Sequence, residues 1–298
     1  MKLTDLTALR LKAMDIRVDI VRSLATAGSG HSAGPLGMAD IFTALFFNVA
    51  NIDPAQPAWP ERDRIFLSNG HICPVLYATM AQAGFFPVEE LATLRKLGSR
   101  LQGHPHRENL PGLESTSGPL GSGTSQAAGT ALAFKMDKSK AQVWCLTSDG
   151  EQQEGNTWEG VMFAAAKKLD NLTVIMDRNY IQIDGNTEDI MPLEPLADKY
   201  RAFNWNVVEV DGHNMAAVIA AMNQSKSMHN EMSGRPTLIL ANVVPGKGVK
   251  YMENNYIWHG APPGIADVAG APPKAEQLAV ALADLAAMRA QIEAAKIN

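Results

Sequence analysis

Cysteine is scarce in this chain of 298 residues, which contains only Cys73 and Cys145. Two cysteines do not make the disulfide framework of a small secreted protein, so we interpret them as reduced cytoplasmic thiols. The sequence also lacks an apolar run long enough to span a membrane, and its N-terminus lacks a signal-peptide core. Basic residues are not in excess, and the net charge of −5 gives no reason to expect nucleic acid or an anionic membrane as partner. These absences favour a cytoplasmic enzyme subunit.

The chain does contain enough apolar sequence, 46% of its residues, for a substantial core. Helical and strand patterns alternate without repeats, which fits an α/β protein. Helices are expected over 5–27, 38–49, 125–134 and 215–225, and strands over 143–146, 172–176, 206–210 and 236–243. Gly- and Pro-rich loops are expected over 98–123 and 244–270, and an Ala-rich helix over 274–296. We predict one domain over 1–270 and a helical tail over 271–298.

The most informative segment joins two short apolar runs, 143–146 and 172–176, through a helical pattern. Apolar residues recur there at helical spacing and predict one stripe that packs on a sheet: Trp158, Val161, Met162, Ala165 and Leu169. Strand, helix and strand in this order form a right-handed βαβ unit. The predicted fold is therefore α/β, with a mostly parallel sheet and helices on both faces.

Polar residues follow both of these strands. Asp149 comes after the first and Asn179 after the second, so both should lie at the carboxyl ends of neighbouring parallel strands, where such folds bind ligands. Mg²⁺ prefers oxygen ligands and usually shares its coordination with substrate phosphates. One carboxylate, one amide oxygen and a backbone carbonyl fit that role. A turn and a loop without a special role are the alternative interpretation, but the complete strand–Asp-Gly–helix–strand–Asn order favours a metal and diphosphate site.

Histidines in loops form a second group of candidates. Five of them lie beside or near glycine in expected loops: His31, His71, His104, His106 and His259. A single loop histidine is usually solvated, but several next to glycine favour a polar small-molecule site, because glycine lets backbone and ligand come close. Histidine can donate, accept or carry a proton near neutral pH.

The segment from Asp149 to Asn179 resembles the diphosphate-binding motif of thiamine diphosphate enzymes, which opens Gly-Asp-Gly and closes on Asn about thirty residues later. The chain departs from it at Ser148, which replaces the first Gly, and at Arg178, where many members carry an Asn. Beyond this motif, residues 5–264 are similar to the N-terminal half of transketolase. The motifs SGHSAGPLGMADI, ERDRIFLSNGH, GHP, TSGPLGSG and WHG occur in the order found in that family.

This resemblance implies a thiamine diphosphate-binding fold and a role for individual positions. The active-site histidines would be His31, His71, His104 and His259. Of these, His71 and His259 would lie near the diphosphate together with Gly150, while His31 and His104 would face the donor sugar. His106 has no clear counterpart and is expected on the surface.

The remaining implied positions bind the metal and the rest of the cofactor. The metal ligands would be Asp149, Asn179 and the carbonyl of Ile181, with Mg²⁺, Ca²⁺ or Mn²⁺ as the ion. Backbone contacts to the rings of thiamine diphosphate would come from Gly118 and Leu120. Acidic residues near the subunit interface would be Glu154 and Glu159, which in the family couple the paired sites.

By the same resemblance, the reaction would transfer a two-carbon ketol unit from a ketose phosphate to an aldose acceptor. The cofactor takes up the electrons released when a carbon–carbon bond breaks. In the family, the glutamate that contacts the aminopyrimidine ring and the residues that hold the donor phosphate belong to a second, pyrimidine-binding domain. This chain is about half as long as such members, so we expect an N-terminal subunit that is active only with a separate C-terminal subunit, in an α₂β₂ assembly.

Three alternatives remain open from the sequence. The chain could be the α subunit of a 2-oxo acid or acetoin dehydrogenase, although the Gly103-His104-Pro105 and GPLG loops argue against it. It could be a non-catalytic relative that binds only the cofactor or a partner, or a fragment of a longer enzyme. Pentose phosphates are the default substrates, with branched and sulfonated sugars as open possibilities.

Overall fold

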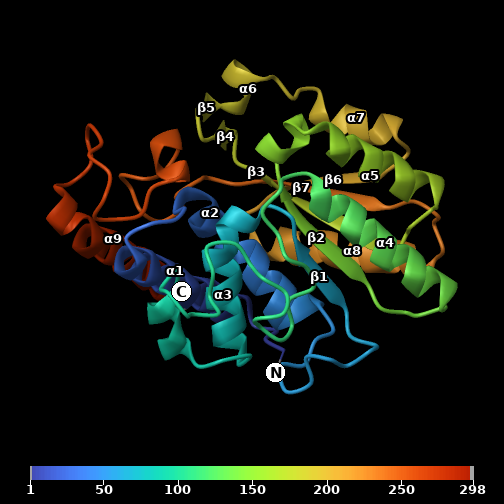
Figure 1. Cartoon of the computed structure of the whole chain (residues 1–298), viewed down its shortest axis with the longest axis horizontal. Coiled ribbons are helices and arrows are strands. Elements are labelled where there is room, and N and C mark those ends of the chain that lie inside the picture. The colour runs from blue at the N-terminus through green and yellow to red at the C-terminus, as the bar shows by residue number, and fades with distance from the viewer. Residues whose placement is uncertain (1, 296–298) are drawn as a thin grey trace.

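A five-stranded parallel sheet runs through the centre of the computed structural model, which describes residues 2–295 (Figure 1). Its strands lie in the order β1-β2-β3-β7-β6, with bounds β1 (Arg64–Leu67), β2 (Val143–Ser148), β3 (Leu172–Arg178), β7 (Thr237–Asn242) and β6 (Asn206–Asp211). A small antiparallel ribbon follows β3 and consists of β4 (Ile181–Gln182) and β5 (Gly185–Asn186). All four predicted strands of the main sheet are present, and the predicted mostly parallel α/β fold is confirmed.

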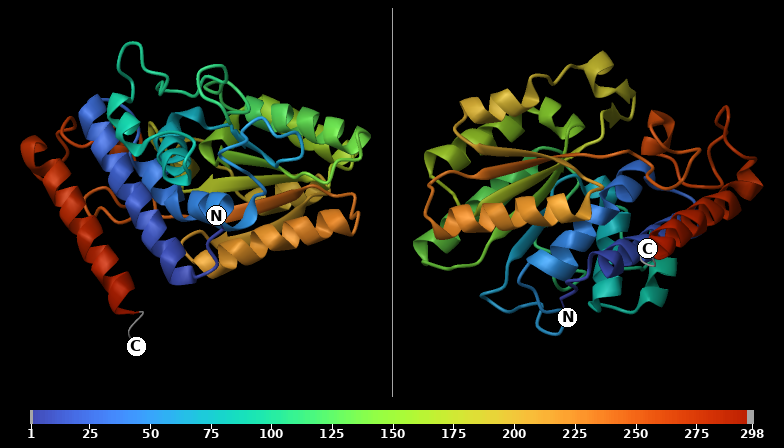
Figure 2. Two further views of the ribbon diagram at one scale, coloured as in Figure 1. Left: turned by 90° about the horizontal axis from the view of Figure 1, so that it is seen from below. Right: turned by 180° about the vertical axis from the view of Figure 1, so that it is seen from behind.

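Helices cover both faces of this sheet (Figure 2). One face carries α4 (Ser122–Met136), α5 (Gly155–Ala166) and α7 (Leu196–Ala202). The other carries α2 (Ala33–Ala44) and α8 (Met215–Asn230), with α1 (Leu6–Ala27), α3 (Cys73–Ala83) and α9 (Lys274–Ala294) as an outer layer. The short helices are α6 (Thr187–Ile190), the π-helical η1 (Leu45–Val49) and the 3-10 turns η2 (Gly70–Ile72), η3 (Val88–Thr93), η4 (Gly150–Gln153) and η5 (Tyr256–His259).

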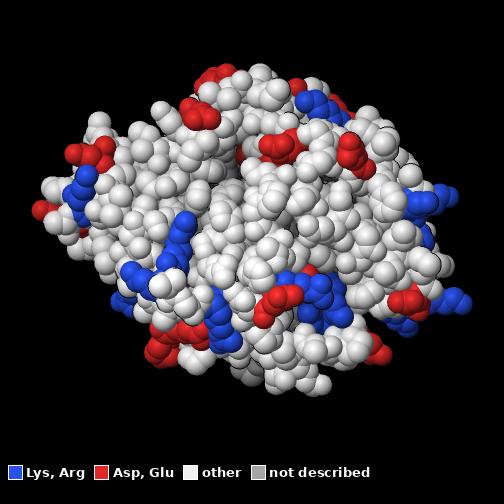
Figure 3. Space-filling view, viewed as in Figure 1, with Lys and Arg blue, Asp and Glu red and all other residues white. Residues whose placement is uncertain are grey.

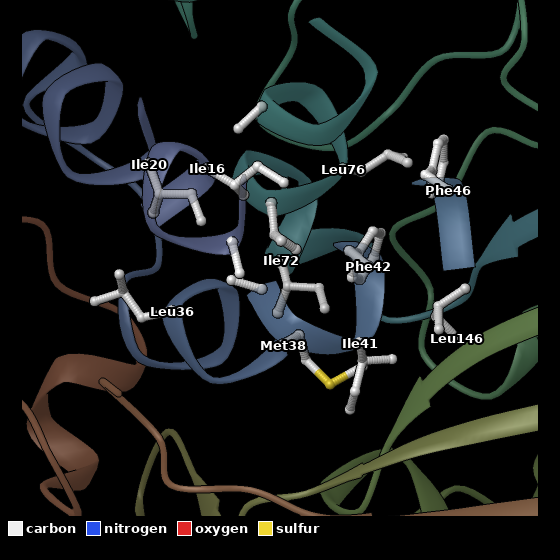
Figure 4. Packing of buried hydrophobic residues seen from close by; sticks show 14 of the residues in the cluster. Ile16, Ile20, Leu36, Met38, Ile41, Phe42, Phe46, Ile72, Leu76 and Leu146 are labelled. Atoms are coloured by element: carbon white, nitrogen blue, oxygen red, sulfur yellow. The ribbon is translucent and has the colours of Figure 1, made fainter. Parts of the chain in front are cut away.

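The sheet separates two hydrophobic cores, and alternate side chains of its strands point into one or the other. Trp144 and Leu146 of β2 point into the core formed with α1, α2 and α3, while Val143 and Cys145 point into the core formed with α4 and α5. Successive side chains of a strand point to opposite faces, and a parallel sheet covered on both faces buries both. Figure 4 shows the first core, in which side chains from α1, α2 and α3 meet Leu146 of the sheet.

The helix predicted over 38–49 begins earlier, at Ala33, and its last turn is the π-helical η1. The Gly- and Pro-containing stretch before Met38 resembles a loop in sequence but forms the buried first turns of α2. Pro35 is tolerated there because the first helical N–H groups need no intrahelical partner. Gly34 is required by packing, since a Cβ at this position would lie 2.7 Å from Ile72.

The apolar stripe predicted for the 158–169 helix is confirmed in part: Val161 and Leu169 are buried and Trp158 and Ala165 are partly buried, but Met162 does not belong to it. The buried residues of α5 are Thr157, Gly160, Val161 and Ala164, whereas Met162 is 57% exposed. The reason is close packing of α5 on α4: a Cβ on Gly160 would lie 2.7 Å from Ser125 Oγ. Small side chains therefore form the contact with α4, while Met162 is left outside and Trp158 packs against Tyr200 and Phe203.

The segment of residues 64–83 contains β1 and α3, for which no element was predicted. β1 has only four residues and follows the charged run Glu61-Arg62-Asp63. α3 begins at Cys73-Pro74, where proline is compatible with a first turn. These elements matter for the site because the loop between them carries His71.

The C-terminal helix α9 packs beside α1 (Figure 2). Ala281 and Leu285 are buried in this contact, Arg289 pairs with Asp15, and Tyr251 Oη donates to the Gln277 carbonyl at 2.9 Å. The helix predicted over 274–296 is thus present from Lys274 to Ala294, and its expected last position lies outside the described residues. The division into a domain over 1–270 and a tail over 271–298 stays a prediction.

Basic and acidic side chains are interspersed on the face of the molecule shown in Figure 3, with broad uncharged areas between them. The same face is hollowed near the end of β3 and the start of α2 (Figures 1 and 3). Within residues 2–295, the helices are all too short or too polar to cross a membrane.

Candidate active site

The carboxyl ends of β2 and β3 bring Asp149 and Asn179 together, as the sequence predicted. The two strands pair in parallel with Ser148 opposite Asp177, and the Asp149 N–H donates to the Asp177 carbonyl at 3.1 Å. The backbone N–H of Tyr180, the residue after Asn179, donates to Asp149 Oδ2 at 2.7 Å. Residues thirty positions apart in sequence are therefore neighbours at one edge of the sheet.

Asp149 is fully buried and held by three donors. Its Oδ1 accepts from the Gly150 N–H at 2.7 Å, and its Oδ2 accepts from Tyr180 N–H and from Arg178 at 3.1 Å. Burial raises the pKa of Asp149 to about 6, and the Arg178 charge and the two N–H donors oppose that rise. The carboxylate is thus fixed in one orientation.

The donor set near Asp149 fits a hard divalent cation that shares its coordination with a phosphate. Asn179 Oδ1 accepts from the Ile181 N–H at 3.0 Å, which fixes the amide next to the Ile181 backbone. Within residues 2–295, no group of three or more His, Cys, Asp or Glu side chains is arranged so that it could hold a metal ion by itself. Mg²⁺ does not need such a cluster, because it is commonly bound by one or two carboxylates plus substrate phosphates.

Three histidines meet at the centre of the site. The ring centroids of His31 and His71 are 4.9 Å apart, those of His71 and His259 are 5.1 Å apart, and those of His31 and His259 are 5.6 Å apart. They come from the loop before α2, from η2 after β1 and from η5. Three loops that are distant in sequence therefore converge on one place.

These histidines are neutral at pH 7. Burial, followed by the neighbouring His259, lowers the pKa of His31 to about 4, and burial lowers the pKa of His259 to about 4. The pKa of His71 is also lowered, first by burial and then by His259 and His31. Neutral imidazoles can both donate and accept hydrogen bonds, which suits contacts to hydroxyl and phosphate oxygens.

We expect the chain to lose stability as the pH falls from about 6.5 toward about 4, because an unfolded histidine takes up a proton near 6.5 whereas His31 and His259 resist it until about 4. Protonation therefore favours the unfolded chain throughout that window. The measurement is the free energy of unfolding at pH 7 and pH 5, by denaturant titration. The double variant His31→Asn/His259→Asn should show a smaller loss; an equal loss would contradict this explanation.

The histidines line a cavity of about 430 Å³. Its wall contains most of the residues implied by the resemblance: His31, His71, His104, Gly118, Leu120, Gly150, Glu154, Ile181 and His259. Asp149 and Asn179 lie directly beneath this wall, next to Gly150 and Ile181. Glu159 lies exposed on α5 and His106 is partly buried, and neither lines the cavity. Larger hollows of about 670 and 760 Å³ open elsewhere, but histidines are absent from their described linings.

Several buried polar atoms near the cavity have no hydrogen-bond partner among the described residues. They include Nδ1 of His31 and His259, both amide atoms of Asn69, Ser117 Oγ and both carboxylate oxygens of Asp177. Buried polar groups are nearly always satisfied in folded proteins, so a convergent set of unsatisfied ones is typical of a ligand site. Asp177 is fully buried, and burial followed by the neighbouring Asp149 charge raises its pKa well above the usual range.

Glu151 is a functional residue that reasoning from the sequence missed. Its buried carboxylate accepts from Ser68 Oγ and from the N–H groups of Gly121 and Ser148. It thereby holds the start of α4, which follows the Gly118–Leu120 part of the cavity wall, against the ends of β1 and β2. A carboxylate directly after Asp-Gly at the end of a buried strand is the signal that could have identified it.

Comparison with known proteins relates this chain to transketolases. Residues 8–276 match the family described as "Transketolase, thiamine diphosphate binding domain". The 6-deoxy-6-sulfo-D-fructose transketolase subunit SqwG of Clostridium sp. is 42% identical over 84% of this chain and 90% of that protein. An apulose-4-phosphate transketolase subunit of Phocaeicola vulgatus is 39% identical over 86% of this chain and 89% of that protein.

Longer transketolases match over part of their length. The crystal structure of transketolase from Campylobacter jejuni superposes with a TM-score of 0.81 at 29% identity, over 97% of this chain and 48% of that one. A fold with this sheet, this histidine cavity and these matches defines a thiamine diphosphate binding domain. The chain belongs to the transketolase family and is a transketolase subunit, corresponding to the thiamine diphosphate binding domain of the longer enzymes.

Proposed function

We propose that this chain holds the diphosphate end of thiamine diphosphate, with a divalent cation, in the histidine-lined cavity. With a second chain it would transfer a two-carbon ketol unit from a ketose phosphate to an aldose acceptor. The observation that carries this proposal is the position of a buried Asp149–Asn179 pair directly beneath a cavity whose wall contains His31, His71 and His259.

The metal would be held by the Asp149 carboxylate, the Asn179 amide oxygen and the Ile181 carbonyl. Mg²⁺ is the default ion, and Ca²⁺ and Mn²⁺ accept the same oxygen ligands. His71, His259 and Gly150 would contact the diphosphate, because they line the same cavity as Ile181. Gly118 and Leu120, which also line it, would contact the rings of the cofactor from the loop before α4.

Thiamine diphosphate, when bound, supplies an acceptor for the electrons of the breaking carbon–carbon bond. The chain's own residues would bind and orient the sugar. His31 and His104 would donate hydrogen bonds to sugar hydroxyls and accept protons from them, as general acid–base groups do. His104 sits at the exposed rim of the cavity, and burial followed by the Arg95 charge lowers its pKa, so it too favours the neutral form.

A partner subunit is supported by the apolar surface beside the cavity. Exposed apolar side chains gather on the segments that border it: Ile183, Ile190, Met191, Tyr256 and Ile257. Such patches mark interaction surfaces, and the similar proteins of Clostridium sp. and Phocaeicola vulgatus are both named as subunits. We infer a C-terminal transketolase subunit with the pyrimidine-binding domain as partner, an α₂β₂ assembly in the cytoplasm, and Glu154 and Glu159 near the interface.

Pentose phosphates are the proposed default substrates. The names of the similar subunits refer to a sulfonated sugar and to the branched sugar phosphate apulose 4-phosphate. Both kinds of donor belong in a substrate panel, because specificity is determined by the site and the partner rather than by the fold.

The test is consumption of substrate by the chain reconstituted with the subunit encoded beside it, with thiamine diphosphate and Mg²⁺. We expect ketose phosphates, offered with ribose 5-phosphate as acceptor, to be consumed, and pyruvate and other 2-oxo acids to be left unchanged. Consumption of 2-oxo acids alone would instead identify a dehydrogenase subunit.

A further inference from the structure

Arg178 occupies an unusual place for an arginine, at the last position of β3 between Asp177 and Asn179. Its side chain is fully buried. One guanidinium nitrogen donates to Asp149 Oδ2 at 3.1 Å and to Thr187 Oγ1 at 3.1 Å. A permanent positive charge therefore touches the carboxylate that would bind the metal.

The other end of the buried guanidinium contacts two glutamates whose side chains are partly exposed. Its second terminal nitrogen donates to Glu188 Oε1 at 2.7 Å and to Glu194 Oε1 at 2.8 Å. The side chains of these glutamates are 34% and 54% exposed, and the guanidinium stacks on the Tyr180 ring with its carbon 3.9 Å from the centroid. Arg178 thus connects a buried carboxylate to two solvated ones, using the forked geometry that favours arginine over lysine.

The charges in this cluster determine how a cation binds. With Arg178 in contact, Asp149 has a counter-ion without any metal, and its orientation is fixed. A divalent cation on the same carboxylate would lie within a few ångströms of the guanidinium, and like charges at that separation repel in a site screened only partly by solvent. Glu188 and Glu194 reduce this repulsion because they neutralise part of the arginine charge.

We propose that Arg178 is the resident counter-ion of Asp149 and that the Arg178–Glu188–Glu194 cluster sets the divalent-cation affinity of the site. Arg178 holds the Asp149 carboxylate in place and lowers the affinity of the site for the divalent cation, while Glu188 and Glu194 raise that affinity. The proposal rests on the metal site of the proposed function. It identifies three positioning residues outside the ligand set, and residues of that kind commonly tune metal affinity.

The test is Mn²⁺ binding to the reconstituted pair with saturating thiamine diphosphate, followed through the electron paramagnetic resonance signal of free Mn²⁺. Arg178→Gln should tighten Mn²⁺ binding by about fivefold, and Glu188→Gln/Glu194→Gln should weaken it by about threefold. Arg178→Lys keeps the charge but not the forked contacts, so Mn²⁺ affinity should change less than in Arg178→Gln.

Weaker or unchanged Mn²⁺ binding in Arg178→Gln would overturn the proposal. If that variant does not fold, the two glutamate substitutions decide, because they are at the surface and leave the Arg178–Asp149 contact in place; unchanged binding there would also overturn it. Absence of Mn²⁺ binding by the unaltered pair would instead refute the metal site itself, so the two failures are distinguishable.

Discussion

Replacing Asp149 by Asn should abolish metal-dependent cofactor binding and reduce ketol transfer by at least about 100-fold, because the only carboxylate of the proposed ligand set is lost. Asparagine has nearly the same shape and can still accept one hydrogen bond from Tyr180 N–H or Gly150 N–H. Arg178 would keep Glu188 and Glu194 as partners, so the variant should fold. The measurements are thiamine diphosphate binding by calorimetry with and without Mg²⁺, and the rate of the reconstituted pair.

The matched control for this variant is Asp189→Asn. Asp189 is exposed on α6 and, within residues 2–295, accepts a hydrogen bond only from Asn186, so its loss should leave cofactor binding and rate within about twofold. Near-normal Mg²⁺-dependent binding by Asp149→Asn, in a variant with unchanged circular dichroism, would show that the metal is held elsewhere.

Replacing His31 by Ala should reduce kcat/KM for the ketose donor by about 100-fold or more, the usual contribution of a positioned acid–base group. The His31 ring lies against both His71 and His259 in the histidine cluster. Its Nδ1 is buried without a partner among the described residues, and the residue lines the cavity. Steady-state kinetics of the reconstituted pair, with donor concentration varied, measures the effect.

His106→Ala is the control for the histidine variant. His106 lies in the same long loop as His104 but outside the cavity lining, so its removal should change kcat/KM by less than about twofold. Equal losses in the two variants would mean that the proposed cavity is not where the sugar binds.

Strands β2 and β3 could be predicted because buried parallel strands are continuous apolar runs, whereas the short β1 was missed. The runs 143–146 and 172–176 are extended by only two residues each at their carboxyl ends in the structure, and those added residues include Ser148 and Asp177. Once the strands were assigned, the parallel topology was enough to bring Asp149 next to Asn179. That part of the site follows from the sequence alone.

Helix positions were harder to predict where packing overrides local preference. Gly34 and Pro35 disfavour helix interiors, yet here they lie in the first turn of α2, where proline is tolerated and where the neighbouring Ile72 leaves no room for a side chain at position 34. For α5, hydrophobic spacing pointed to Met162, but the contact with α4 selected Gly160 and Ala164. Both differences arise from close approach between elements, which a single sequence does not encode locally.

The polar environment of the site could be predicted only in part. Asn69 and Asp177 are buried without partners among the described residues. Glu151 accepts hydrogen bonds from Ser68 and Gly121 and so joins two loops. Each of the three is a single polar residue in the sequence, and its neighbours in space come from distant segments. Arg178 was noticed as a departure from the usual motif, whereas its contact with two surface glutamates depends on the fold of residues 188–194. Long-range convergence of this kind requires the structure.

The most direct test of the proposed function is ketol transfer from xylulose 5-phosphate to ribose 5-phosphate, with thiamine diphosphate and Mg²⁺, by this chain alone and with its partner. We expect activity from the pair and none from the single chain, because the histidine-lined cavity provides the diphosphate side of the site only. Robust activity from the single chain would contradict the need for a partner. Absence of activity from the pair with every ketose phosphate of the panel would contradict the proposed reaction.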